Sequence, residues 1–262
     1  DMMWMIIDKN HIKHLNKKLL EKYTNQYWNK RIKGYGVGED TRIASKSLNK
    51  FKPKNYKNII MLHIFKDSPF NYIDRERIFS DYYEWVEKTL EILCNSEERW
   101  IVRTHPNAKR WGEDSEKIFQ LIYNRVCLKM GKKPNIYLDK KKISNLDIFK
   151  SANKIVTFSG TPHIEAVCFG LKPIIISDVT LSVLSKKLVL KPKSLKEYKD
   201  LILNNENKDK FKSKKYESDF AKKILFITEN TLSFSKQLKV KLININDKNI
   251  KLIKNLKKNI LI

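Results

Sequence analysis

The chain has 262 residues, a formal net charge of +25 and a hydrophobic content of 41%. That apolar content supplies a core and excludes disorder along the whole chain, while the length suits one large domain or two small ones. No window approaches the roughly 18–20 consecutive apolar residues that a membrane-spanning helix needs. Three cysteines without metal-ligand spacing, Cys94, Cys127 and Cys168, indicate reduced thiols in a cytoplasmic protein.

Lysine supplies most of the positive charge, because only 8 of the 54 basic residues are arginine. A dedicated nucleic-acid binder would use more arginine for bidentate contacts, so no specific nucleic-acid partner is expected. Residues 208–262 hold 15 lysines against 5 acidic residues. This basic tail favours attraction to a phosphorylated substrate, to anionic lipid headgroups or to a polyanion. A lysine-coated surface produced by biased codon usage explains the same excess.

Short apolar runs alternate with helical patterns along the middle of the chain. Strands are expected at 58–65, 100–104, 135–138, 154–158, 173–177 and finally 188–190. Helices are expected after Asp74 with apolar residues recurring from Ile78 to Leu93, over 114–130 before Gly131, over 145–152, and from Pro162 to Gly170. This alternation predicts an α/β fold, a Rossmann-like parallel sheet with flanking helices.

Three parts of the chain are expected. Residues 1–54 carry an amphipathic helix and form a helical cap or the remnant of a larger N-terminal domain. Residues 55–205 form the Rossmann-like domain. Residues 206–262 form a basic helical tail, in which Phe220, Ile224, Leu225 and Ile227 make one apolar set.

Ligands of parallel α/β sheets bind at the carboxyl ends of the strands, and one predicted strand ends there in Arg103-Thr104-His105-Pro106. Proline stops the strand and bends the chain, which would hold the imidazole of His105 at the rim of the sheet. An imidazole in that place can bond a phosphate or a base. A structural histidine packed under a loop is the alternative.

A second candidate is the turn Ser159-Gly160-Thr161-Pro162, which follows a strand and opens a helix. Glycine allows close backbone approach, and the hydroxyls of Ser159 and Thr161 are suited to bind phosphate together with helix N-terminal amides. Glu165 follows one turn later, where its carboxylate can accept from two ribose hydroxyls. The alternative is an ordinary capped helix in which Glu165 completes a capping box.

Asp67 is a third candidate, because it follows the first predicted strand in a loop with Ser68 and Pro69. A carboxylate there is suited to act as a general base toward a substrate hydroxyl. It is equally suited to be a turn residue.

The His105-Pro106 pair, together with residues 159–176, resembles the C-terminal, donor-binding half of GT-B glycosyltransferases of bacterial capsule and surface-polysaccharide synthesis. The similarity is greatest to the capsule-synthesis proteins that include Kdo transferases, and it extends to sialyl- and polysialyltransferases. It covers about residues 55–185. The family uses two Rossmann-like domains, and the 54 residues before the predicted Rossmann-like domain are too few to form the acceptor-binding one.

The resemblance implies transfer of a sugar, Kdo or sialic acid, from a CMP-sugar substrate to a glycan or glycolipid acceptor. It implies no cofactor and no metal, and work at the inner face of the cytoplasmic membrane, with peripheral contact to anionic lipid. The catalytic residues it implies are His105 and Asp67. The donor-binding residues are Arg103, His105, Pro106, Lys109, Ser159, Gly160, Thr161 and Glu165.

Two other functions remain open. A UDP-sugar 2-epimerase or a CDP-polyol phosphotransferase shares this architecture and differs in nucleotide preference. A basic nucleic-acid-binding protein would instead show steeply salt-dependent binding to polyanions.

Overall fold

A computed structural model describes residues 17–33, 56–66, 78–105, 108–139, 143–177, 186–203 and 208–226. Asp67, Asp74, Pro106 and Ile227, which the sequence analysis singled out, lie outside these ranges.

A five-stranded parallel sheet forms the centre of the molecule, in the order β3-β2-β1-β4-β5. The strands are β1 (Asn58–Met61), β2 (Trp100–Arg103), β3 (Ile136–Asp139), β4 (Lys154–Thr157) and β5 (Ile174–Ile175). The chain runs outward from β1 to β3 and then crosses back to β4, so the strand order reverses between β1 and β4. The structure thereby confirms the predicted Rossmann-like α/β fold.

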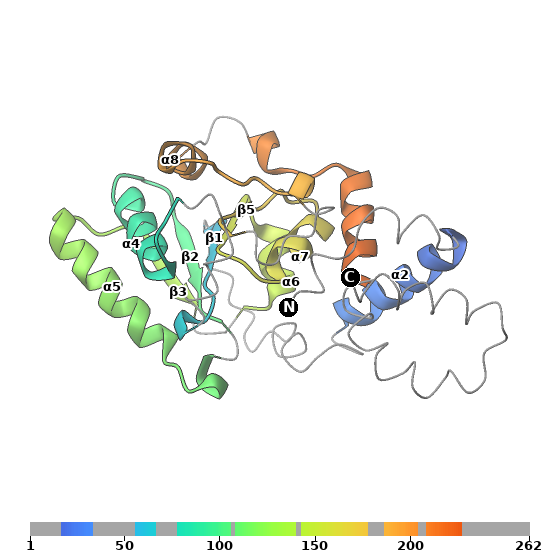
Figure 1. The fold of residues 1–262 in the computed structure, drawn as a ribbon, viewed down its shortest axis with the longest axis horizontal. Coiled ribbons are helices and arrows are strands. Elements are labelled where there is room, and N and C mark those ends of the chain that lie inside the picture. Colours follow the sequence, from blue (N-terminus) through green and yellow to red (C-terminus); the bar gives the residue numbers. More distant parts are fainter. Residues whose placement is uncertain are drawn as a thin grey trace, which may run out of the picture.

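The inner strands are buried on both faces, which explains their uninterrupted apolar sequence. Side chains alternate between two clusters along β1: Ile60 packs in the larger cluster with α4 (Tyr82–Leu93), while Ile59 and Met61 pack in another with α6 (Asn145–Ser151). Figure 1 shows the sheet between α4 and α5 on one side and α6 and α7 on the other.

Polar side chains begin the helices where the sequence favours a cap. Asp81 accepts from the backbone N–H of Glu84 at 2.7 Å and starts α4. Asp114 and Ser144 start α5 (Ser115–Met130) and α6 in the same way, and Gly131 ends α5 with a φ of 63°. The helix expected from Ile78 therefore begins at Tyr82, because Asp81 supplies the cap.

Three strands differ from expectation. The strand expected at 173–177 is limited to Ile174–Ile175. The first strand ends at Met61 instead of continuing to Phe65. The strand expected at 188–190 is wrong: Lys186–Leu188 is a turn of 3-10 helix, η4, and Leu190 alone pairs with the edge strand β5. Leu190 donates to the carbonyl of Pro173 at 2.8 Å and accepts from Ile175 at 3.0 Å. One paired residue is too few for a strand.

Helix α2 (Lys17–Ile32) and the helical residues 215–226 pack together against α7 (Pro162–Cys168). Trp28 contacts Phe169 with ring centroids 5.3 Å apart, and Tyr27 contacts Phe226 at 5.7 Å. The expected apolar set is confirmed for Ile224, Leu225 and Phe220, which join this cluster. Figure 1 shows the helix of residues 215–226, in orange, beside α2. The predicted division of the chain at residues 54 and 205 stays a prediction.

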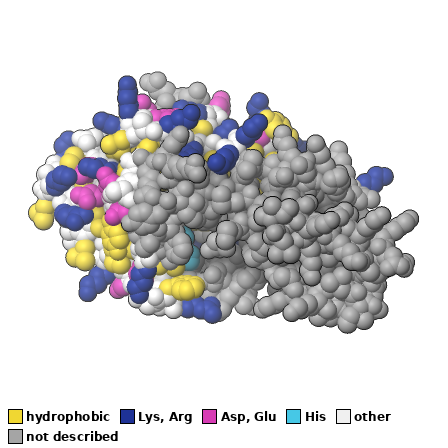
Figure 2. Space-filling view, in the orientation of Figure 1, with side chains coloured by type: hydrophobic (Ala, Val, Ile, Leu, Met, Phe, Trp, Pro, Cys, Tyr) yellow, Lys and Arg dark blue, Asp and Glu magenta, His cyan; other side chains and the backbone are white. Residues whose placement is uncertain are grey.

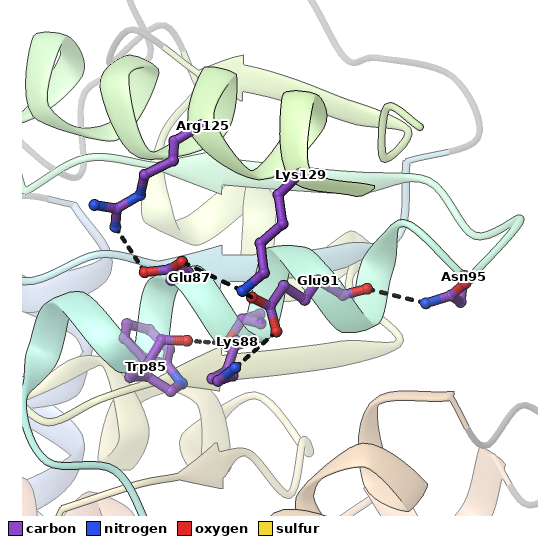
Figure 3. A network of polar contacts seen from close by, with 8 residues as sticks. Trp85, Glu87, Lys88, Glu91, Asn95, Arg125 and Lys129 are labelled. Atoms are coloured by element: carbon purple, nitrogen blue, oxygen red, sulfur yellow. Dashed lines mark hydrogen bonds and ion pairs between the residues drawn. The ribbon is translucent and has the colours of Figure 1, made fainter. Parts of the chain in front are cut away.

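Charged side chains are dispersed over the surface. On the face drawn in Figure 2, the Lys and Arg side chains of described residues are scattered, with acidic side chains among them. Between α4 and α5, Arg125 bonds Glu87 at 2.6 Å and Lys129 bonds Glu91 at 2.7 Å (Figure 3). Among the helices in the described ranges, none is long and apolar enough to cross a membrane.

Candidate functional site

The carboxyl ends of β1, β2 and β4 bring together His63, His105 and Gly160. His63 lies two residues beyond β1, His105 two beyond β2, and Gly160 three beyond β4. The site falls where the strand order reverses, which is the place where open α/β sheets bind ligands.

Two histidines from neighbouring strands face one another at this edge. Met61 pairs with Arg103 in the β1–β2 register, so His63 and His105 stand at corresponding positions two residues further on. Their ring centroids are 5.6 Å apart, and both residues are half-buried. Neutral or charged, each imidazole offers at least one N–H donor. The pair is therefore suited to bond an anion from two sides.

Tyr82, the first residue of α4, fixes the backbone at His63. The amide of His63 donates to the Tyr82 hydroxyl at 2.5 Å, and that hydroxyl donates back to the His63 carbonyl at 3.3 Å. Burial raises the pKa of Tyr82 well above its ordinary value, so the phenol stays protonated and can make both bonds. Its ring packs against Phe65 and Phe158 in the core. The position of His63 is thus tied to the hydrophobic core.

Glycine is required at residue 160. Its φ is 97°, and a Cβ there would lie 3.2 Å from Cδ of Pro162 and 3.7 Å from Cδ2 of His63. The Thr157 hydroxyl donates to the Ser159 carbonyl at 2.9 Å, which holds the start of the same turn. The turn therefore runs directly beside the ring of His63.

His163 closes the turn from inside the protein. Its Nδ1 lies 2.5 Å from the Gly160 carbonyl, which only accepts, so Nδ1 carries the proton and Nε2 does not. Burial lowers the pKa of His163 to about 4, which makes the ring neutral at pH 7. Nε2 is buried and has no partner among the described residues. His163 therefore supports the turn as a neutral donor.

The capping box that the sequence offered as the alternative for Glu165 is not formed at α7. Thr161 occupies the N-cap position of α7, but its side chain makes no capping bond. Glu165 does not reach back to the cap either. Its Oε1 accepts from Nε of Arg31 at 3.1 Å and also from Nη2 of Arg31. Ser159 is buried and Thr161 is half-buried at the turn, and binding of phosphate by their hydroxyls stays a prediction.

Arg103 is engaged within the protein. Its side chain is 4% exposed, and its Nη1 bonds Oδ2 of Asp139 at 3.4 Å and the Ile143 carbonyl. Burial lowers the pKa of Arg103, while the charges of Asp139 and Glu165 act in the opposite direction. Lys109 is exposed on η3 (Ala108–Trp111), the turn that follows His105. Binding of the donor by either cation stays a prediction.

Asp67 and Pro106 lie outside the described residues, so their predicted roles also stay predictions. Within the described ranges, no group of three or more His, Cys, Asp or Glu side chains could hold a metal ion. The expectation of a metal-independent site remains a prediction as well.

Sequence reasoning missed His63, because this residue sits inside the apolar run 58–65. The parallel register was the signal that could have found it, since aligning the two strands places His63 beside His105. It also missed Arg31, for which the sequence near Glu165 holds no signal.

Comparison with known proteins adds little beyond the fold. No family model matches the chain, and no curated protein does. Among solved structures, the chain is similar to the N-terminal domain of Candida albicans trehalose-6-phosphate phosphatase, with a TM-score of 0.38 and 14% identity. The alignment covers 87% of this chain and 48% of that one, so the chain spans about half the length of the structure it matches. A likeness this distant carries no functional inference.

Proposed function

We propose that this chain binds the donor of a glycosyl transfer, a CMP-sugar, at the carboxyl edge of its sheet. The observation that carries the proposal is the convergence of His63, His105 and the Gly160 turn where the strand order reverses. The resemblance of residues 159–176 and of His105-Pro106 to capsule glycosyltransferases supplies the reaction class.

The phosphate would lie over the Gly160 turn. Absence of a side chain at residue 160 lets an anion approach the backbone closely. The imidazole of His63 lies beside the turn, and that of His105 lies next to His63. The chain's net charge of +25 attracts anionic ligands to it at low salt. The ribose would be held by Glu165, whose carboxylate accepts hydroxyl hydrogen bonds.

The proposed reaction joins the acceptor hydroxyl oxygen to the anomeric carbon of the sugar. The bond from that carbon to the phosphate oxygen breaks, and CMP leaves with the electron pair. N–H donors at His105 and His63 would stabilise the charge that develops on the leaving phosphate. The hydroxyl proton passes to a base, for which the sequence offers Asp67. The acceptor is a glycan or glycolipid, and contact between the basic tail and anionic lipid would bring the chain to the inner membrane face.

Titration calorimetry with CMP, CDP, UDP and GDP at two salt concentrations tests the proposal. We expect selective binding of CMP that loses roughly tenfold or more in affinity in His105→Ala and in His63→Ala, since hydrogen bonds to a charged group contribute about 1.5–3 kcal/mol. Tyr216→Ala is the matched control, because this exposed side chain lies outside the site.

Other outcomes identify other functions. Selectivity for UDP or CDP favours the epimerase or the polyol phosphotransferase. Equal binding of all four nucleotides, lost at high salt, would show a polyanion-binding surface and would contradict the proposed function.

A further inference from the structure

A buried ion pair joins α2 to the candidate site. Arg31 is the penultimate residue of α2, and Glu165 lies in the first turns of α7, 134 positions further along the chain. Their side chains are 5% and 9% exposed. Arg31, which comes from the helix α2, thus holds the carboxylate of Glu165, the residue that the sequence predicts to bind the ribose.

The geometry of this pair is asymmetric. Arg31 directs both Nε, at 3.1 Å, and Nη2 to the same oxygen, Oε1 of Glu165. The hydroxyl of Tyr27, one helical turn earlier, accepts from Nη1 at 2.7 Å and orients the guanidinium. Oε2 of Glu165 accepts no bond from any residue within the described ranges. One oxygen is therefore fixed and the other is left for a ligand.

A second guanidinium acts on the same carboxylate. Arg103 is close enough to Glu165 for their charges to interact, although its hydrogen bonds go to Asp139 and Ile143. Both arginines thus bring positive charge to the carboxylate of Glu165, whose oxygens accept hydrogen bonds.

We infer that Arg31 is a positioning residue for ribose recognition: it holds Glu165 as an oriented anion whose Oε2 accepts from the two ribose hydroxyls. The inference rests on the proposed function, since it assumes a nucleotide at this edge. Its alternative is that Arg31 only fastens α2 to α7, as Trp28 does through Phe169.

The two explanations differ in one measurable quantity, the preference for ribose over a sugar without hydroxyls. A positioning role acts through the 2′- and 3′-hydroxyls, so losing Arg31 reduces the affinity for CMP and leaves the affinity for 2′,3′-dideoxy-CMP unchanged. A fastening role changes both affinities by the same factor.

The experiment compares affinities for CMP and 2′,3′-dideoxy-CMP, by calorimetry, in wild type, Glu165→Gln, Arg31→Met, Arg31→Lys and Tyr27→Phe. In wild type we expect CMP to bind roughly 10- to 100-fold more tightly than 2′,3′-dideoxy-CMP, which is the range for hydrogen bonds to a charged group. This factor is the ratio of the two affinities. Glu165→Gln and Arg31→Met should bring that ratio close to one. Arg31→Lys should restore part of it, because the charge remains while the fork geometry is lost. Tyr27→Phe keeps the ion pair and should retain most of the ratio.

Thermal unfolding of each variant shows whether a loss of affinity comes from an unfolded chain or from a displaced Glu165 in a folded chain. If Arg31→Met does not fold, the ratio in Arg31→Lys decides: a value below that of wild type supports the inference, and the wild-type value overturns it. A wild-type ratio that persists in every folded Arg31 variant but disappears in Glu165→Gln would overturn the inference and leave the proposed function intact. Failure of wild type to bind CMP at all would overturn the proposed function, and the inference with it.

Discussion

Replacing Gly160 with alanine places a methyl group in the tightest part of the site. At a φ of 97° an L-residue is strained, and the new Cβ would lie 3.2 Å from Cδ of Pro162, closer than ordinary van der Waals contact. Backbone strain of this kind costs about 1–3 kcal/mol. At roughly 2–4 °C per kcal/mol for a domain of this size, the midpoint of thermal unfolding should fall by several degrees.

The same substitution should weaken nucleotide binding by about tenfold, because a shift of a few tenths of an ångström in the turn moves backbone donors that must meet a phosphate. Gly170→Ala is the matched control. Gly170 has a φ of 84° and nothing within 4 Å of its Cβ position, so it carries backbone strain without the contact. Differential scanning calorimetry and CMP titration of both variants form the assay.

We expect both variants to be destabilised and only Gly160→Ala to lose affinity for CMP. Wild-type affinity in Gly160→Ala would refute the placement of the phosphate at this turn. An equal loss in Gly170→Ala would show that general destabilisation, and not the turn, governs binding.

Three further substitutions test separate features of the site and of the fold. Tyr82→Phe removes both bonds to the backbone of His63 and should lower the free energy of unfolding in urea by about 1–3 kcal/mol, together with CMP affinity; unchanged affinity would separate His63 from the site. His163 stays neutral in the folded state down to its pKa of about 4, whereas the unfolded residue binds a proton below about 6.5. The free energy of unfolding should therefore fall by about 3 kcal/mol between pH 6.5 and 4, and His163→Asn should remove that part of the pH dependence. Lys129→Ala breaks exposed pairs between α5 and α4, so its midpoint of urea unfolding should stay close to that of wild type. A clear fall in the midpoint would mean that the network in Figure 3 acts cooperatively.

The sheet could be predicted because buried parallel strands are apolar on both faces, as Ile59, Ile60 and Met61 are in β1. The starts of α5 and α6 lie within one residue of the expected positions 114 and 145, and the structure shows that Asp114 and Ser144 cap them. The strand expected at Leu190 failed, because an apolar triplet does not reveal whether its backbone pairs for one residue or for several. The β-propensity of the residues identifies an apolar run, but whether that run pairs as a strand depends on the neighbouring strand.

The site was predicted in part. His105 and the Gly160 turn were placed at the carboxyl edge, because strands that end in proline or glycine turns mark that edge. His63 was not recognised as a candidate because it lies in an apolar run, and one polar residue at the end of a buried strand is common. The ion-pair partner of Glu165 could not be predicted from the sequence. Arg31 lies 134 positions away, and only the packing of α2 brings it near Glu165.

That long separation bears on the order in which the protein folds. The units β1–α4–β2 and β4–α7–β5 join segments close in sequence, and contacts of that kind form early. Bringing Arg31 to Glu165 closes a much longer loop. The entropy cost of closing it is offset only after α7 has formed a surface on which α2 can pack. In refolding, we therefore expect secondary structure to return before discrimination between CMP and 2′,3′-dideoxy-CMP. The chain would acquire its preference for ribose in the last kinetic step, when α2 docks.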